Sequence, residues 1–225
     1  MIPIGDDNVP GAPFPIINVL LIVINTLVFI FEATLDPNSL QVFVNHWAVT
    51  PTQILAGQQW ITLITGMFMH GSWLHLIGNM LFLAIFGDNI EGVIGHIPYL
   101  VFYMLGGLAA AFTHIFFNAT SNVPSLGASG AIAAVMGAYI VMFPRSKVRS
   151  FVFLGFFGFM TRISAIVFLG IWFLLQLFSG VTSLGVNTAQ TSGVAVWAHV
   201  GGFVFGIVIG IFLRGRAARA MSRYY

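Results

Sequence analysis

The sequence contains no cysteine and very little charge. Eight of its 225 residues are Lys or Arg and six are Asp or Glu, so 6% are charged, against about 25% in a typical soluble domain. The missing cysteines exclude a disulfide and a thiol nucleophile. The scarcity of charge excludes an ordinary soluble domain, a disordered chain and a nucleic-acid-binding protein. Because 58% of the residues are hydrophobic, we expect a single membrane domain over residues 1–225.

Six apolar stretches are candidates for crossing a bilayer, whose hydrocarbon core of about 30 Å requires roughly 20 helical residues. Acidic residues and prolines precede the first stretch, and no Lys or Arg does, so we expect a retained span and not a cleaved signal. The sequence thus predicts an all-α integral membrane protein. Its expected spans are residues 14–33, 73–87, 97–117, 129–143, 163–180 and 194–213.

The basic residues orient these spans, because Lys and Arg collect on the cytoplasmic side of a membrane. They follow the fourth span, precede the fifth and follow the sixth: Arg145, Lys147, Arg149, Arg162, Arg214, Arg216, Arg219 and Arg223. With six crossings, both short terminal tails are cytoplasmic and the loops 34–70, 118–127 and 181–193 face outward. We therefore expect a multi-pass protein of a plasma or inner membrane, in contact with membrane lipids.

Two stretches depart from an up-and-down bundle. Residues 151–160 are apolar but too short to cross as a helix, so we place them against the inner interface or the bundle. The first outer loop carries Trp47, Pro51 and Trp60, which predicts that it lies partly sunk in the outer interface. The third outer loop is rich in Gly, Ser, Thr and Asn, which indicates a mobile cover.

An unsatisfied polar group within a span is costly and therefore a functional candidate. Four of those in the predicted spans stand out: His75, Asn79, Ser129 and His199. At about 1.5 Å per residue, Ser129 and His199 both lie roughly 21 Å above the inner ends of their spans. His75 lies about 20 Å above the inner end of its span by the same measure, and Asn79 follows one turn later on the same helix face. Three spans thus bring polar groups to one depth near the outer surface, where we expect a water-filled cavity.

These groups fit nucleophilic acyl transfer, which needs a hydroxyl, a base that takes its proton, and donors for the developing oxyanion. Ser129, between small residues in GASG, supplies the hydroxyl and His199 the base. His75, Asn79 and the Ser129 backbone N–H at a helix start are candidate oxyanion donors. A triad would need a carboxylate at the depth of His199, and the acids of this chain lie at span ends and in loops. A Ser-His dyad is therefore favoured over a triad, and Glu32 is the one acid that the sequence does not exclude.

The motifs that carry these residues resemble the rhomboid family of intramembrane serine proteases. MHGSWLHLIGN, GDNIEG, GASGAIAAVMGAY and AHVGGFVFG occur in the family's order and extend the resemblance over nearly the whole chain. The resemblance implies a bundle of six transmembrane helices in which Ser129 attacks a peptide bond of a transmembrane protein near a membrane surface. It also implies that His199 is the general base and that His75, Asn79 and the Ser129 backbone hold the oxyanion.

The resemblance further implies that Gly202 and Gly206 let the sixth helix approach the fourth closely. It implies that the first outer loop and a mobile fifth helix admit the substrate. Two positions depart from the family pattern. Ala133 stands where many members have an aromatic residue that packs on the catalytic histidine, and Ile61 follows Trp60 where many have arginine. We therefore expect His199 to be held in a different way.

Two other functions stay open at this stage. A catalytically silent relative would bind membrane helices without cutting them. A small-solute transporter would use His75, Asn79 and His199 along its path, and it would need polar groups that continue to the inner side, whereas the inner halves of these spans are apolar. We expect no cofactor, and no spacing of His, Asp or Glu predicts a metal site. His70, nearer the outer rim, is expected to hold the loop.

Overall fold

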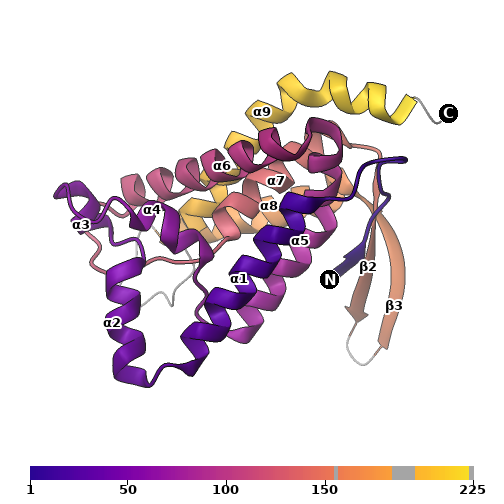
Figure 1. Cartoon of the computed structure of the whole chain (residues 1–225). Coiled ribbons are helices and arrows are strands. Elements are labelled where there is room, and N and C mark those ends of the chain that lie inside the picture. Colours follow the sequence, from indigo (N-terminus) through magenta and orange to yellow (C-terminus); the bar gives the residue numbers. More distant parts are fainter. Residues whose placement is uncertain (155–156, 184–195, 223–225) are drawn as a thin grey trace.

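The computed structural model describes residues 1–154, 157–183 and 196–222, and in these ranges six long helices form a bundle (Figure 1). Five of them are long and apolar enough to cross a membrane, and the remaining one has 14 residues. This confirms the predicted helical membrane bundle. The helices are α1 (Ile16–Thr34), α5 (Trp73–Ile94), α6 (His96–Phe117), α7 (Ser129–Met142), α8 (Ala165–Ser183) and α9 (Val196–Ser222).

The shortest of these helices, α7, lies at the centre of the bundle, and nearly all its residues are buried. Alanine and glycine occupy six of its 14 positions, and small side chains allow membrane helices to pack backbone to backbone. Its closest neighbour is α9. A Cβ on Gly206 of α9 would overlap the carbonyl oxygen of Ala134, and one on Gly202 would overlap that of Gly130. The two glycines therefore permit the close approach that the family resemblance implies.

The segment between α1 and α5, which the sequence predicts as the first outer loop, folds into short helices: α2 (Pro37–Trp47), α3 (Pro51–Leu55), α4 (Thr62–Thr65) and the 3₁₀ helix η1 (Gly66–Phe68). α2 begins where the Asp36 carboxylate accepts the backbone N–H groups of Asn38 and Ser39, an N-cap that satisfies two otherwise unpaired donors. Paired backbone hydrogen bonds between Val49 and Ser125, of 2.9 and 2.8 Å, tie this loop to the segment that leads into α7.

At the other end of the bundle, three antiparallel strands form a small sheet in the order β1 (Ile2–Gly5), β2 (Lys147–Leu154), β3 (Phe157–Ser164) (Figure 1). Lys147 pairs with Ser164 and Leu154 with Phe157, so β2 and β3 form a hairpin. The sequence placed the apolar stretch 151–160 at this end but predicted no strand there, and it began the fifth span at residue 163 instead of Ala165.

The hairpin has a physical basis in its composition. Both strands are rich in Val, Ile, Phe and Thr, which favour a pleated surface. Side chains alternate between faces in a strand, and in β2 the buried Val148 and Ser150 alternate with the exposed Lys147 and Arg149. Since β1 pairs with β2, the N-terminal segment and the α7–α8 connection lie at the same end of the bundle.

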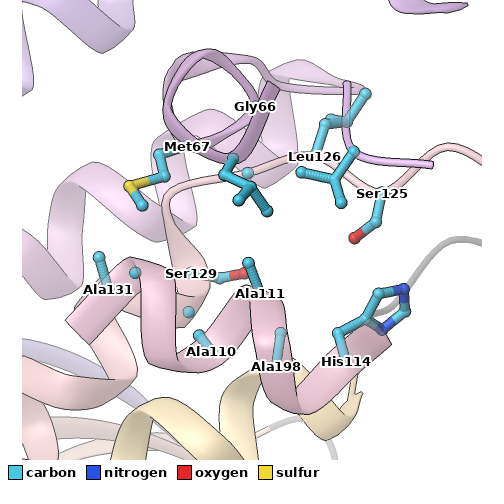
Figure 2. Close-up of a pocket in the computed structure, with 15 residues that line it drawn as sticks. Gly66, Met67, Ala110, Ala111, His114, Ser125, Leu126, Ser129, Ala131 and Ala198 are labelled. Carbon is cyan, nitrogen blue, oxygen red and sulfur yellow. The ribbon is translucent and has the colours of Figure 1, made fainter. Parts of the chain in front are cut away.

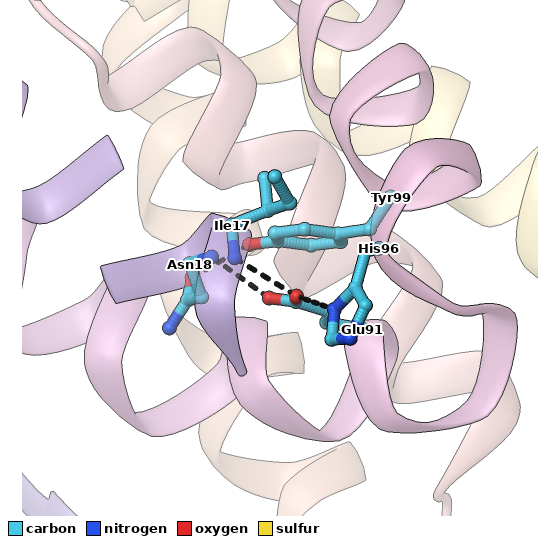
Figure 3. A network of polar contacts seen from close by, with 5 residues as sticks. All are labelled: Ile17, Asn18, Glu91, His96 and Tyr99. Atoms are coloured by element: carbon cyan, nitrogen blue, oxygen red, sulfur yellow. Dashed lines mark hydrogen bonds and ion pairs between the residues drawn. The ribbon is translucent and has the colours of Figure 1, made fainter. Parts of the chain in front are cut away.

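A buried carboxylate joins three helices near this end of the bundle (Figure 3). Glu91 of α5 accepts the backbone N–H groups of Ile17 at 2.9 Å and Asn18 at 2.7 Å. It therefore caps the start of α1, where the helix dipole favours negative charge. Its carboxylate also contacts the ring of His96 at the start of α6, and the Tyr99 hydroxyl donates to the Asn18 side chain at 2.7 Å. These contacts hold α1, α5 and α6 in a common register.

Candidate active site

Ser129 is the first residue of α7, and the chain enters it through a constrained glycine. Gly127 has φ of +126° and donates its N–H to the Gly66 carbonyl at 2.8 Å. A side chain is strained at this φ, and a Cβ here would also come within 2.8 Å of the His75 ring. Because the first backbone N–H groups of a helix have no partner within it, the Ser129 N–H is available near its own hydroxyl.

One cavity of about 250 Å³ brings together the four residues singled out in the sequence, Ser129, His199, His75 and Asn79. They come from three helices, α7, α9 and α5, and α8 closes the cavity with Trp172 and Gln176. The common depth deduced from the arginine positions thus corresponds to a common place in the fold. The remaining lining residues are Leu74, Gly78, Phe82, Ile132 and Met136.

The oxyanion candidates His75 and Asn79 are held by the loop before α5. The Ser72 hydroxyl caps this helix by accepting the His75 N–H at 3.2 Å. The Gly71 N–H points to Nδ1 of His75 at 3.5 Å. This contact makes Nδ1 the acceptor and places the ring proton on Nε2. That nitrogen lies 2.9 Å from the Cβ position of Gly127, beside Ser129.

His70 supports Asn79, one side-chain layer behind the cavity. The Asn79 amide nitrogen donates to Nε2 of His70 at 3.0 Å. Burial and, after it, the neighbouring His75 lower the pKa of His70 to about 4, so the ring is neutral and can accept this bond. The residue is 4% exposed, and its expected role of holding the loop agrees with these contacts.

Glu32, the acid left open by the sequence, does not serve His199 in this structure. Its carboxylate accepts the His70 backbone N–H at 3.1 Å, and it is not among the residues that line the cavity. No Asp or Glu is found among the described residues that line it. The site therefore corresponds to a serine and a histidine without a carboxylate.

The imidazole of His199 contacts α8 instead. Its Nδ1 lies 2.7 Å from Oε1 of Gln176, and the ring centroid of Trp172 lies 5.8 Å from its own. Neither Gln176 nor Trp172 was predicted from the sequence as a site residue. A signal was present, because Gln176 is an amide within an otherwise apolar stretch of α8, and polar groups inside a membrane span are functional candidates.

A second, smaller pocket of about 40 Å³ lies behind Ser129, between α6 and the loop that contains Gly66. Figure 2 shows Ser129 in this pocket, with alanines of α6 on one side and the Gly66 loop on the other. Small residues dominate its α6 wall, so only a small group fits beside the serine. The labelled residues around it include Met67, Ala110, Ala111, His114, Ser125, Leu126, Ala131 and Ala198.

The predicted mobile cover, 181–193, lies largely outside the described residues.

In the described part of the chain, no group of three or more His, Asp or Glu side chains is arranged to hold a metal ion.

Comparison with known proteins identifies a family model, the Rhomboid domain, that matches residues 57–216. Presenilin-associated rhomboid-like protein A, mitochondrial, of Danio rerio is 34% identical over 89 residues, which are 39% of this chain and 23% of that protein. Rhomboid protein 1, mitochondrial, of Saccharomyces cerevisiae is 33% identical over 97 residues, 41% of this chain and 28% of that protein. RHOMBOID-like protein 4 of Arabidopsis thaliana is 27% identical over 161 residues, 72% of this chain. The chain matches between 23% and 36% of the length of these relatives.

Proposed function

The chain belongs to the rhomboid family, and we propose that it is an intramembrane serine endopeptidase that hydrolyses peptide bonds of transmembrane proteins. Ser129 is the nucleophile and His199 the general base of this proposal. The observation that carries it is the single cavity in which these two residues meet His75 and Asn79. A hydroxyl, a base and two side-chain donors at one place are what acyl transfer requires.

In the first step, the Ser129 oxygen attacks the carbonyl carbon of the scissile peptide bond. His199 takes the hydroxyl proton on Nε2, because its Nδ1 is engaged by Gln176. The carbonyl oxygen becomes an oxyanion as its π bond breaks. The imidazolium then returns the proton to the leaving amine as the C–N bond breaks, which leaves an acyl-serine. Water, deprotonated by His199, attacks the acyl-serine in the same manner and releases the carboxylic acid.

Three donors are available for the oxyanion. The Ser129 N–H stands at the start of α7, where the helix dipole favours negative charge. His75 presents Nε2–H, since its Nδ1 faces the Gly71 N–H. Asn79 uses one amide proton for His70 and keeps the other. Because these groups are positioned before the reaction, they stabilise the transition state without reorganising.

The proposal extends to the membrane setting. From the positions of the basic residues we propose that both termini are cytoplasmic, that the protein lies in a plasma or inner membrane, and that the cavity lies near the outer face. We treat residues 1–225 as one membrane domain with short terminal tails. Transmembrane substrates and membrane lipids are its proposed partners, and the chemistry uses no metal or cofactor.

The test is cleavage of a model transmembrane substrate by the purified protein in liposomes. We expect wild type to cleave and Ser129→Ala and His199→Ala to be inactive. Ser179→Ala is the matched control, because Ser179 is an exposed serine of α8 whose hydroxyl donates to the Leu175 carbonyl of its own helix, and this variant should retain full activity. Cleavage by Ser129→Ala at the wild-type rate would refute the proposed nucleophile.

Labelling with a serine-reactive fluorophosphonate separates an inactive protein from an unsuitable substrate. Wild type should be labelled at Ser129 whether or not it accepts the chosen substrate. A wild-type protein that binds the substrate helix but is neither labelled nor catalytic would indicate the alternative function, a catalytically silent protein that binds membrane helices.

A further inference from the structure

Gln176 is an isolated polar group in the first part of α8. From Ala165 to Phe178 the helix reads AIVFLGIWFLLQLF, with one amide among apolar side chains. A polar side chain in a membrane span is costly unless it finds a partner. The partner here is the imidazole of His199, whose Nδ1 lies 2.7 Å from the carbonyl oxygen Oε1 of Gln176.

This contact determines the protonation of the imidazole. A carboxamide oxygen only accepts hydrogen bonds, so Nδ1 must carry a proton and Nε2 must be unprotonated in neutral His199. The unprotonated Nε2 is the nitrogen that accepts the hydroxyl proton of Ser129 in the proposed mechanism. In a Ser-His-Asp triad, a buried aspartate accepts the same hydrogen bond from Nδ1–H of the histidine.

No other described residue is placed to accept a hydrogen bond from Nδ1 of His199. The cavity has no Asp or Glu in its lining, and Glu32 is engaged by the backbone of His70. Within the described residues, the Gln176 contact is the one hydrogen bond found for the His199 ring. His199 is itself 9% exposed, so bulk water is largely excluded from it.

The aromatic ring that packs on the imidazole of His199 lies on the same face of α8 as Gln176. Trp172 lies one turn before Gln176, a spacing that places both side chains on one side of α8. Its ring centroid is 5.8 Å from that of His199 and 5.9 Å from that of Phe203. In α7, Ala133 stands where many family members have an aromatic residue. In this chain α8 therefore supplies both the aromatic contact and the hydrogen bond to His199.

We infer that Gln176 is a positioning residue that holds His199 in the tautomer and orientation needed for the attack of Ser129, in place of a triad carboxylate. The inference rests on the proposed function and adds to it. Gln176 does not touch the reacting atoms in this role; it acts through His199. It follows that α8 is needed for the base to be competent, and not only to enclose the cavity.

The test compares Gln176→Met, Gln176→Glu and Leu175→Met in the full chain. Methionine keeps the length of the side chain and removes the acceptor oxygen, whereas glutamate keeps an acceptor. Leu175→Met is the matched control, because it introduces the same residue at a neighbouring exposed position. The measurements are kcat and KM on the model transmembrane substrate, and the rate at which fluorophosphonate labels Ser129.

We expect Gln176→Met to lower kcat by at least about tenfold, with KM changed less than about twofold, because only the orientation of the base is affected. The labelling rate should fall in parallel. Gln176→Glu should restore both quantities to within a few-fold of wild type, and Leu175→Met should match wild type. A merely structural amide predicts no rescue by glutamate, since a carboxylate packs no better than methionine in an apolar helix.

Three outcomes would overturn the inference. If wild type is active and Gln176→Met is equally active, Gln176 has no positioning role while the proposed function stands. If glutamate and methionine cause the same loss, the contact is structural, or the amide donates to Nδ1 instead of accepting from it. If wild type neither cleaves nor is labelled, the proposed function fails and the inference fails with it.

Discussion

The ring of His75 lies against the backbone of Gly127, two residues before Ser129. A methyl group on Gly127 would come within 2.8 Å of Cε1 and 2.9 Å of Nε2 of this ring, and 3.7 Å from the hydroxyl of Ser129. The positive φ of +126° at Gly127 makes this close passage possible, because residues with a Cβ rarely adopt it. The serine and its neighbouring donor are thus placed by one glycine.

Gly127→Ala should therefore reduce activity strongly. The methyl group must push His75 away from Ser129, and loss of one oxyanion donor typically costs about 10²–10³ in kcat. The measurement is kcat on the model substrate. Gly57→Ala is the control, since Gly57 also has positive φ, +78°, but nothing lies within 4 Å of its Cβ position. If both variants keep full activity, the His75 contact is irrelevant to catalysis.

Asn79→Ala should lower kcat by about 10²–10³ and leave KM nearly unchanged, because an oxyanion donor acts mainly in the transition state. His70→Ala should give a smaller decrease, since it removes only the group that holds Asn79. In the double variant the two effects should not add. Steady-state kinetics on the four proteins check this, and strictly additive effects would show that His70 does not act through Asn79.

Asp6 should make stability depend on pH. Burial raises its pKa in the folded protein to about 6, from 3.8. The folded state therefore binds the proton more tightly, and this stabilisation, about 3 kcal/mol, is present below pH 3.8 and lost as the pH rises through 6. Tyr139 and Asn89 both donate to Oδ2 of Asp6, so an asparagine oxygen can replace it.

The melting temperature of Asp6→Asn, relative to wild type, should accordingly rise from pH 4 to pH 8. Asp36→Asn is the control with the opposite sign. Hydrogen bonds from Ser39 and Asn38 lower the pKa of Asp36, so its contribution is present above pH 3.8 and lost as the pH falls through the lowered value. A pH-independent difference between wild type and Asp6→Asn would contradict the burial of an ionisable Asp6.

Gly206→Ala should separate α7 from α9. The new Cβ would overlap the carbonyl oxygen of Ala134, and overpacking of this kind costs about 1–3 kcal/mol. Activity should fall with stability, because α9 carries His199. Gly170→Ala, at a helical glycine of α8 with open space around its Cβ position, should not lower the melting temperature. Equal melting temperatures for all three proteins would mean that the helices are less tightly packed than described.

The candidate site was largely predictable because its signals are local. The small residues of GASG, the four-residue spacing from His75 to Asn79 and the arginines at the span ends are read directly from the sequence. A regular rise per residue then converts position into depth. Depth does not specify rotation, however, and in a membrane both the lipid-facing and the bundle-facing sides of a helix are apolar. For this reason the direction of Gln176 was not predictable from the pattern of α8.

The sequence by itself determined that this chain is a helical membrane protein, which ends of the fourth, fifth and sixth predicted spans are basic, and which polar residues share a predicted depth. These properties follow from composition and spacing along one chain. Only the tertiary structure decided that the imidazole of His199 meets Gln176 of α8 at 2.7 Å, that Glu32 is used elsewhere, and that residues 147–164 include a hairpin joined to the N-terminus. Each of these depends on helix rotation or strand pairing between segments far apart in sequence, and hydropathy carries no information about either.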